Sequence, residues 1–347
     1  MKILVTNFKN RFTGVTTTAL NVAKHQQKCL NQPIQIIGNT LGYESLSTIS
    51  AWTLLFRWNE VVGKDHVVMH VRRDSEMLYG LLARDVLKRP IKLVFTSANT
   101  KPRSRVGQWY MSQMDAVIAT NDAASRALPV KAAAVIPHGV DMSMFAPNLR
   151  TTNQSRKMIG CVGRVRPGKG THHFVRAFIH LAKMEPNLHA VAYGHVAPSD
   201  ADFHDMLQSE IADAGLTDRF HWAGEVHYKE LPSKLGCCDA LVALPEYEPF
   251  GLTPLEAMAM GIPTVCSRTG CFPDAIMPGV NGYLVDHDDT KATVDAIGRV
   301  LSWSIHDPEV TDRIRRTVQN NFSISKEATS ILDLYHVLNG KNDRLGE

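Results

Sequence analysis

Short apolar runs alternate along the whole chain with longer stretches whose apolar residues recur at helical spacing. In the first half, runs typical of strands occupy residues 2–7, 34–38, 66–71, 91–96, 115–119 and 132–136. In the second half, they occupy residues 157–163, 188–194, 219–223, 239–244, 262–266 and 282–285. Stretches between them, such as 75–88 and 103–114, have a helical pattern. Six strand–helix repeats in each half predict an α/β protein with two doubly wound, Rossmann-like parallel sheets.

The two predicted sheets divide the chain into two domains. The polar stretch at 148–156, NLRTTNQSR, is the natural linker, so we expect domains at 1–150 and 151–320. The remaining residues, 321–347, include a helical stretch at about 325–338 that no strand follows. A chain of 347 residues is long enough to bury two cores of ordinary size.

Composition indicates a globular protein of the reduced compartment. The hydrophobic fraction is 44%, and no apolar run approaches the roughly 18 to 20 residues that span a bilayer. The N-terminus, MKILVTNFKNRF, fits a first strand better than a signal peptide. Six cysteines occur without a Cys-x-x-Cys pair, which favours a cytosolic protein without structural zinc.

Charge is distributed unevenly between the two halves. Residues 1–150 carry a balance of +10 and residues 151–347 a balance of −6, which suggests that the two domains face different partners. Within residues 84–105, seven cations stand against Asp85 alone, and Trp109 and Tyr110 follow. This cluster fits a solvated helix face, a nucleic-acid patch, or a surface for anionic lipid and an acidic acceptor. No recognised nucleic-acid motif accompanies it.

The segment at 239–261, DALVALPEYEPFGLTPLEAMAMG, has the most informative pattern in the chain. It predicts a strand, an acidic glycine-bearing loop, and a helix with Thr253 as N-cap and Pro254 at the first helical position. A helix N-terminus favours a phosphate, and flanking carboxylates such as Glu248 and Glu256 suit sugar hydroxyls. A simpler alternative stays open, in which Glu256 completes a capping box with Thr253 and Glu248 is a solvated loop charge.

Two further loops follow strands and carry candidate binding residues. The segment GRVRPGKG (163–170) offers Arg164 and Lys169 to a phosphate, although its spacing is not that of a P-loop and a solvated turn remains an alternative. In the first half, Gly14 follows the opening strand, where a glycine allows close approach of a ligand. His70 precedes Arg72 and Arg73 at the carboxyl edge of the sheet, where ligands bind; a structural role for His70 is the alternative.

Together these segments resemble the family 4 glycosyltransferases, which have the two-domain GT-B fold. The matching segments, in the family's order, are VIPHGVD (135–141), GRVRPGKG (163–170), AGEVHYKEL (223–231), EPFGLTPLEAMAMGIPTV (248–265), TGCFPDAI and NGYLVD (269–286). More narrowly, the segments NFKNRFTGVTTT (7–18), HVRRDSEMLYGLL (70–82), LVFTSA (93–98) and MDAVIATNDAA (114–124) resemble lipopolysaccharide core mannosyltransferases of Gram-negative bacteria. The chain departs from the family at Gly14, His138, Cys271 and Asp274, which concerns the acceptor side.

The resemblance implies a retaining transfer from a nucleoside-diphosphate sugar, without a metal and without a bound cofactor. It implies that Arg164, Lys169, Glu248 and His70 form the catalytic set. Donor binding would fall to Gly14, Gly251, Leu252, Thr253 and Glu256, with Glu248 on the sugar and Glu256 on the ribose. The last helix would cross back to the first domain. The implied reaction leans towards mannose from GDP-mannose, with UDP-sugars open, onto a lipopolysaccharide core acceptor.

Given that reaction, the basic first domain is expected to meet an anionic surface. We assign Arg72, Arg73, Lys101, Arg103 and Arg105 to a patch for the acceptor and the membrane, which predicts a peripheral protein on the cytoplasmic face of the inner membrane. No nucleic-acid partner is expected.

Other classes of protein remain as alternatives to this interpretation. An epimerase or phosphorylase of similar fold is disfavoured by the spacing of Glu248 and Glu256. A non-catalytic nucleotide-sugar-binding module is disfavoured by Arg164 and Lys169, since a pure binder need not stabilise a leaving group. A dehydrogenase is disfavoured because no G-x-G-x-x-G follows either first strand.

Overall fold

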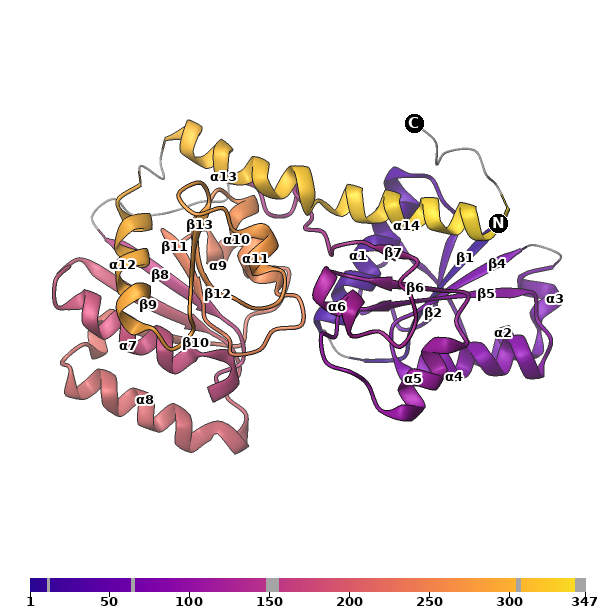
Figure 1. The fold of residues 1–347 in the computed structure, drawn as a ribbon, viewed down its shortest axis with the longest axis horizontal. Helices are drawn as coiled ribbons and strands as arrows, with labels where there is room; N and C mark the ends of the chain where they lie inside the picture. Colours follow the sequence, from indigo (N-terminus) through magenta and orange to yellow (C-terminus); the bar gives the residue numbers. More distant parts are fainter. Residues whose placement is uncertain (11–12, 64–65, 148–155, 304–306, 341–347) are drawn as a thin grey trace. The chain divides into compact units, whose positions relative to one another are not determined.

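The computed structural model describes residues 1–10, 13–63, 66–147, 156–303 and 307–340 (Figure 1). It consists of two compact units. The N-terminal unit contains Met1–Gly139 together with the chain from Ser323 onwards, and the C-terminal unit contains Val140–Phe322. The predicted linker at 148–156, with the domain boundary at 150 and 151, lies outside the described residues except for Arg156.

The N-terminal unit has a seven-stranded, all-parallel sheet in the order β3-β2-β1-β4-β5-β6-β7. Its strands are β1 (Lys2–Asn7), β2 (Ile34–Gly38), β3 (Ser47–Ile49), β4 (Val67–Val71), β5 (Ile91–Ser97), β6 (Ala116–Ala119) and β7 (Ala134–Val135). Its helices are α1 (Gly14–Cys29), α2 (Ala51–Phe56), α3 (Trp58–Val61), α4 (Asp74–Leu81), α5 (Arg105–Ser112), α6 (Asp122–Arg126) and α14 (Ile324–Leu338). A π-helical turn, Leu82–Val86, continues α4.

The C-terminal unit has a six-stranded parallel sheet in the order β10-β9-β8-β11-β12-β13. Its strands are β8 (Lys157–Val162), β9 (Leu188–Tyr193), β10 (Phe220–Gly224), β11 (Ala240–Ala243), β12 (Thr264–Ser267) and β13 (Gly282–Val285). Its α-helices are α7 (Thr171–Ala182), α8 (Ala201–Asp213), α9 (Leu231–Leu235), α10 (Leu252–Ala259), α11 (Phe272–Ala275), α12 (Thr290–Leu301) and α13 (Pro308–Asn321). The prediction of two doubly wound, Rossmann-like α/β sheets is confirmed.

Helices cover both faces of the N-terminal sheet because its strands are apolar on both sides. Ile3 and Val5 of β1 pack into one core with α1 and α14, whereas Leu4 between them packs into the other core with α2 and α4. On the first face, α1 and α14 lie side by side (Figure 1). The helix α14 therefore completes a core whose other members lie before residue 140 in the chain.

The described residues include no helix that is both long and apolar enough to cross a bilayer.

Candidate active site

Two side chains that belong to separate sequence motifs meet in the C-terminal unit. Lys169 ends a short 3-10 turn (Pro167–Lys169) after β8, and Glu248 lies in the loop between β11 and α10. Lys169 Nζ lies 2.5 Å from Glu248 Oε2, and both side chains are only partly exposed. Because β8 and β11 are neighbours in the sheet, their carboxyl ends bring the two loops together.

A glycine makes this meeting possible. Gly170 follows Lys169 directly, adopts a left-handed conformation with φ of 70°, and lies against the end of β11. A Cβ atom at this position would lie 1.8 Å from the carbonyl oxygen of Leu244, which is far inside van der Waals contact. Only glycine tolerates both the conformation and the approach.

The loop that carries Glu248 is held by the end of β12 and the residues that follow it. Ser267 Oγ donates a hydrogen bond to the carbonyl oxygen of Pro245 at 2.7 Å, and the amide of Glu248 donates to Thr269 Oγ1 at 3.2 Å. The amide of Cys271 donates to the carbonyl oxygen of Phe250 at 2.8 Å. These bonds anchor the loop at three points, so Glu248 is presented from a fixed backbone.

The helix after this loop begins earlier than the sequence predicts. It starts at Leu252, and its N-cap is Gly251, with φ of 92° and no side-chain capping bond. The prediction of Thr253 as N-cap and Pro254 as first helical residue is therefore wrong. The left-handed glycine turns the chain into the helix without a capping side chain. The amide ends of Leu252 and Thr253 thus lie in the first turn of a helix with a positive dipole end.

Glu256 lies inside this helix rather than at its cap. It is the fifth residue of α10, its side chain is buried, and no described residue makes a hydrogen bond to its carboxyl group. The capping-box alternative is therefore excluded by the geometry. Burial raises the pKa of Glu256 to about 8, so the group is mostly neutral at pH 7.

Arg164 precedes Lys169 in the loop after β8, but the structure does not bring it into the pair. Its side chain is exposed and makes no ion pair with a described residue. The backbone beside it is fixed, because the amide of Val165 donates to the carbonyl oxygen of His195 at 3.0 Å.

His70 lies at the end of β4 in the N-terminal unit, where it is fully enclosed. Its Nδ1 lies 2.5 Å from the hydroxyl of Tyr335 and its Nε2 lies 2.7 Å from Thr96 Oγ1. Burial, reinforced by the nearby charges of Arg72 and His138, holds its pKa well below the usual value of 6.5. His70 is therefore a neutral imidazole whose two nitrogens are both engaged within the protein.

The predicted surface patch is wrong at its first two cations. Arg72 is only 5% exposed, so it cannot form part of a membrane-facing surface. Arg73 is directed inward: its guanidinium donates to Glu76 at 3.0 Å and to Thr16 Oγ1 at 2.8 Å. It thereby ties the end of β4 to the start of α1, whose first residue is Gly14.

The remaining predicted cations of the patch have different surroundings. Arg103 is paired with Asp74 and lies over the ring of Phe95, 5.0 Å from its centroid. Lys101 and Arg105 are exposed. Arg84 and Lys92, which contribute to the same cluster in the sequence, both pair with Asp115 at 3.0 Å. Much of the basic cluster is therefore neutralised by carboxylates from outside residues 84–105.

Two buried carboxylates organise the N-terminal unit, and neither is singled out by the sequence. Glu76 accepts hydrogen bonds from Thr6 Oγ1 at 2.9 Å and from the amide of Arg72 at 2.8 Å. Glu327 of α14 lies 2.8 Å from His138 Nδ1 and accepts a bond from the amide of Gly139 at 2.7 Å. The one available signal is the acidic position of each residue within the first turn of its helix.

Solved structures of glycosyltransferases share this fold. A glycosyltransferase from Rickettsia africae ESF-5 superposes with a TM-score of 0.80 at 20% identity, covering 99% of each chain. HepE from Anabaena in complex with UDP and glucose gives a TM-score of 0.73 at 18% identity, covering 97% of this chain and all of the other. The chain therefore has the two-domain GT-B fold, as the sequence predicts.

Sequence comparison gives the family. Residues 147–319 match the family model of glycosyl transferases group 1. The lipopolysaccharide core biosynthesis mannosyltransferase LpsB of Rhizobium meliloti (strain 1021) is 33% identical over 97% of this chain and 98% of its own length. The corresponding protein LpcC of Rhizobium leguminosarum bv. viciae is 35% identical over 99% of this chain and 98% of its own length. The chain belongs to the group 1 glycosyltransferases and is an enzyme, which confirms the predicted resemblance and sets aside the dehydrogenase and the non-catalytic module.

The pKa of Glu256 gives a pH test of this site. The folded pKa of about 8 lies above the usual 4.5, so the native state holds a proton that the unfolded state releases. The free energy of unfolding therefore falls as pH rises from about 4.5 to 8. Glu256→Gln removes this titration. We therefore expect the melting temperature of the variant minus that of wild type to be larger at pH 9 than at pH 5. Calorimetry at both pH values measures the difference, and parallel pH profiles would contradict an ionisable buried Glu256.

Proposed function

We propose that the protein transfers mannose from GDP-mannose, with retention of the anomeric configuration, to the core of lipopolysaccharide. Two relatives of nearly the same length, at 33% and 35% identity, have names that describe lipopolysaccharide core mannosyltransferases. Identity over the full length includes the N-terminal unit, which the resemblance assigns to the acceptor. The single observation that carries the mechanism is the Lys169–Glu248 pair beside the start of α10.

The pair supports donor binding through an exchange of partners. Transfer of the sugar leaves negative charge on a diphosphate, and a preorganised cation and helix N-terminus stabilise such charge. Lys169 forms an ion pair with Glu248. An arriving diphosphate competes for Lys169 and frees Glu248 to accept hydrogen bonds from the hydroxyls of the sugar. Arg164, exposed in the same loop, supplies a second cation with a bidentate fork.

The remaining assigned residues have supporting roles in this proposal. The amides of Gly251, Leu252 and Thr253 approach the phosphates, and the carboxyl of Glu256 binds the ribose. Gly14 leaves open space at the start of α1, where a Cβ atom would meet no atom within 4 Å. His70 acts by positioning the end of β4, because both of its ring nitrogens are engaged within the protein.

Loss of the groups that hold the leaving diphosphate or the ribose is expected to slow turnover strongly. We expect Lys169→Ala, which removes positive charge from the leaving diphosphate, and Glu256→Ala, which removes the ribose contact, each to lower turnover by roughly 10²- to 10³-fold. The measurement is release of nucleoside diphosphate from a panel of GDP- and UDP-sugars with a core-lipid acceptor. GDP-mannose is expected to be the best donor.

The matched control is Lys183→Ala, which removes an exposed lysine just beyond the last turn of α7. Its turnover should equal that of wild type. If Glu256→Ala lowers only the melting temperature while the folded fraction keeps its activity, the ribose assignment fails. Faster turnover with a UDP-sugar would overturn the choice of donor.

We further propose that transfer needs no metal ion. Lys169, Arg164 and the start of α10 supply the positive charge that a metal would otherwise bring. Turnover is therefore expected to survive EDTA unchanged. Activity that disappears with EDTA and returns with Mg²⁺ or Mn²⁺ would contradict this.

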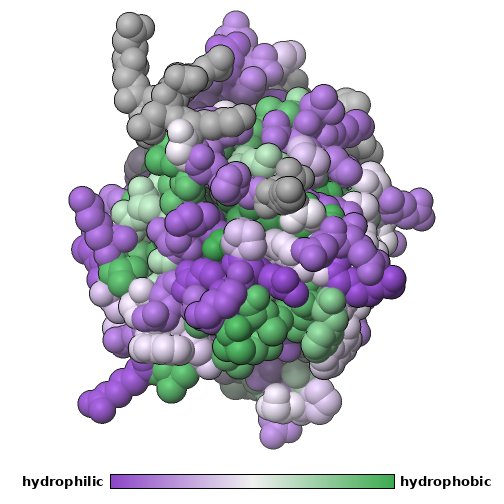
Figure 2. Space-filling view, turned by 90° about the vertical axis from the view of Figure 1, so that its right-hand side faces the viewer, coloured by the Kyte–Doolittle hydropathy of each residue, from purple (hydrophilic) through white to green (hydrophobic). Residues whose placement is uncertain are grey.

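We also propose that the protein binds peripherally to the cytoplasmic face of the anionic inner membrane. The support is an exposed apolar surface on the N-terminal unit. Trp52 and Phe56 of α2 are 70% and 69% exposed, and their rings stack with centroids 5.7 Å apart. Exposed apolar residues of the adjoining helices extend this surface, namely Leu78, Leu82, Val86, Val106 and Trp109. We call these residues, together with Trp52 and Phe56, the apolar face. Figure 2 shows an apolar area bordered by hydrophilic residues on this side of the unit.

The elements that carry the apolar face are joined to one another. Leu78, Leu82 and Val86 recur every fourth residue along α4 and its π-helical turn, so they form one stripe. The hydroxyl of Tyr79 in α4 donates to the carbonyl oxygen of Ala51 in α2 at 2.8 Å. Exposed Lys88 and Arg105 border the face, which combines aromatic anchors with cations as membrane-surface proteins do.

We expect the protein to co-sediment with vesicles that contain anionic lipid, and less so as salt increases. Arg105→Glu changes the charge by two units, so it should lower the partition coefficient by roughly 30-fold at about 1 kcal/mol for each charge. Trp52→Ser with Phe56→Ser should weaken binding even at low salt. The control is Met184→Ser, an equally exposed apolar residue of the C-terminal unit. Equal binding to neutral vesicles, or none to either, would reject the membrane proposal.

A further inference from the structure

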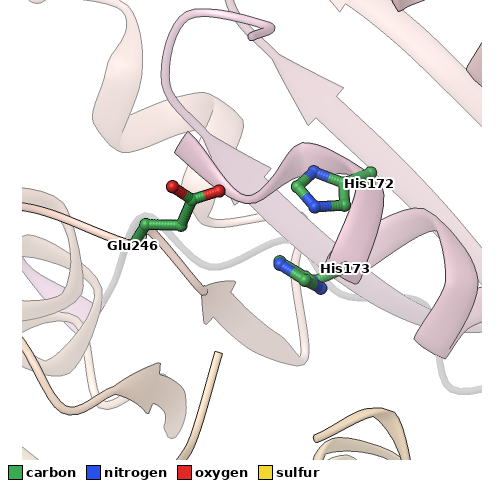
Figure 3. Close-up of side chains that lie close together, drawn as sticks. All are labelled: His172, His173 and Glu246. Atoms are coloured by element: carbon green, nitrogen blue, oxygen red, sulfur yellow. The ribbon is translucent and has the colours of Figure 1, made fainter. Parts of the chain in front are cut away.

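A second cluster lies beside the donor-site residues and is not used by the proposed reaction. His172 and His173 occupy the first turn of α7, and Glu246 lies in the loop after β11. One ligand atom from each residue lies within 4.8 Å of the other two. Figure 3 shows the two imidazoles on the helix and the carboxylate of Glu246 directed toward them from the loop. The ring centroids of the two histidines are 3.8 Å apart.

Both histidines keep a buried nitrogen without a hydrogen-bond partner. These atoms are Nδ1 of His172 and Nε2 of His173, which no described residue contacts by a hydrogen bond. An unsatisfied buried polar atom costs free energy, and a ligand bound at these nitrogens would offset that cost.

The electrostatic surroundings keep these rings uncharged. Burial lowers the pKa of His173 to about 4, and the neighbouring His172, His287 and Arg176 act in the same direction. Burial and Arg176 also lower the pKa of His172, against the opposing carboxylates of Glu246 and Glu210. A neutral imidazole nitrogen offers the lone pair that a metal ligand must supply.

We propose that His172, His173 and Glu246 bind one divalent transition-metal ion of the Zn²⁺ class. Two imidazole nitrogens and one carboxylate oxygen form the ligand set of a three-residue zinc site, with a fourth position for water. Ligand bonds of about 2.0 to 2.1 Å require the ligand atoms to close to about 3.3 Å, which side-chain rotation can supply. Mg²⁺ and Ca²⁺ prefer oxygen ligands, so two nitrogens select against them.

A phosphate is the other ligand that a loop beside a donor site suggests, but the chemistry disfavours it. The carboxylate of Glu246 lies beside both imidazoles and repels an anion. A cation satisfies all three groups at once.

The bound ion would join the same two segments that the Lys169–Glu248 pair joins. His172 lies three residues after Lys169, and Glu246 lies two residues before Glu248. Coordination therefore fixes the loop after β11 against the start of α7. The ion is accessory to transfer in this assignment, and its binding does not depend on the proposed donor or acceptor.

The test is calorimetric titration of the full-length protein with Zn²⁺ in the absence of a donor. Exposed Cys29 and Cys237 are first replaced by Ser, so that thiolates do not contribute. One equivalent should bind, and His172→Ala, His173→Ala and Glu246→Gln should each weaken binding at least about tenfold. His180→Gln is the matched control, because it removes an exposed imidazole about two turns further along the same helix.

Further readouts separate this site from nonspecific binding. Saturating Zn²⁺ should raise the melting temperature of the parent protein and of His180→Gln by about 2 °C or more, and leave His173→Ala unchanged. Excess Mg²⁺ should not displace Zn²⁺. Zn²⁺ affinity that is equal in the parent and in all three ligand variants would overturn the proposal, as would the absence of binding at millimolar Zn²⁺.

Discussion

The close approach of α7 to the end of β11 determines the chemistry of the C-terminal unit. A single missing Cβ at Gly170 permits it, because a side chain there would collide with the backbone oxygen of Leu244. The residues directly before and after Gly170 take their positions from this contact. Lys169 precedes the glycine and meets Glu248, while the two histidines follow it and face Glu246. One steric constraint thus positions both the ion pair and the proposed metal ligands.

In the N-terminal unit, several ionisable groups are buried at the carboxyl edge of the parallel sheet. A charged group that leaves water is tolerated only when hydrogen bonds or an opposite charge replace its hydration. The carboxylates of Glu76 and Glu327 each accept several such bonds from backbone amides and side chains. His70 avoids the cost in another way, by remaining neutral between Thr96 and Tyr335. The carboxyl edge of this sheet is thereby rigid and polar.

Local patterns predicted most of the fold, because apolar runs and turn residues act over a few positions. Strand β3 was missed since Ser47–Ile49 is short and mostly exposed. The start of α10 was misplaced because capping propensity favoured Thr253, whereas tertiary packing selects the left-handed Gly251. The positive charge of residues 84–105 was overestimated because Asp115, which pairs with Arg84 and Lys92, lies outside this range. The partners of Glu327 are about half the chain away, and no local pattern reports such a distance.

The order in which the elements occur along the chain has a consequence for synthesis on the ribosome. The core around α1 requires Ile324, Ala328 and Tyr335 of α14, which are made after the entire C-terminal unit. Until then, β1 and α1 have an uncovered apolar face, and His138 lacks its carboxylate partner Glu327. The C-terminal unit, continuous in sequence, can complete its core first. The segment of β1 and α1 is therefore made before the C-terminal unit but reaches its native packing only after that unit, and the delay lengthens with every residue added to the C-terminal unit.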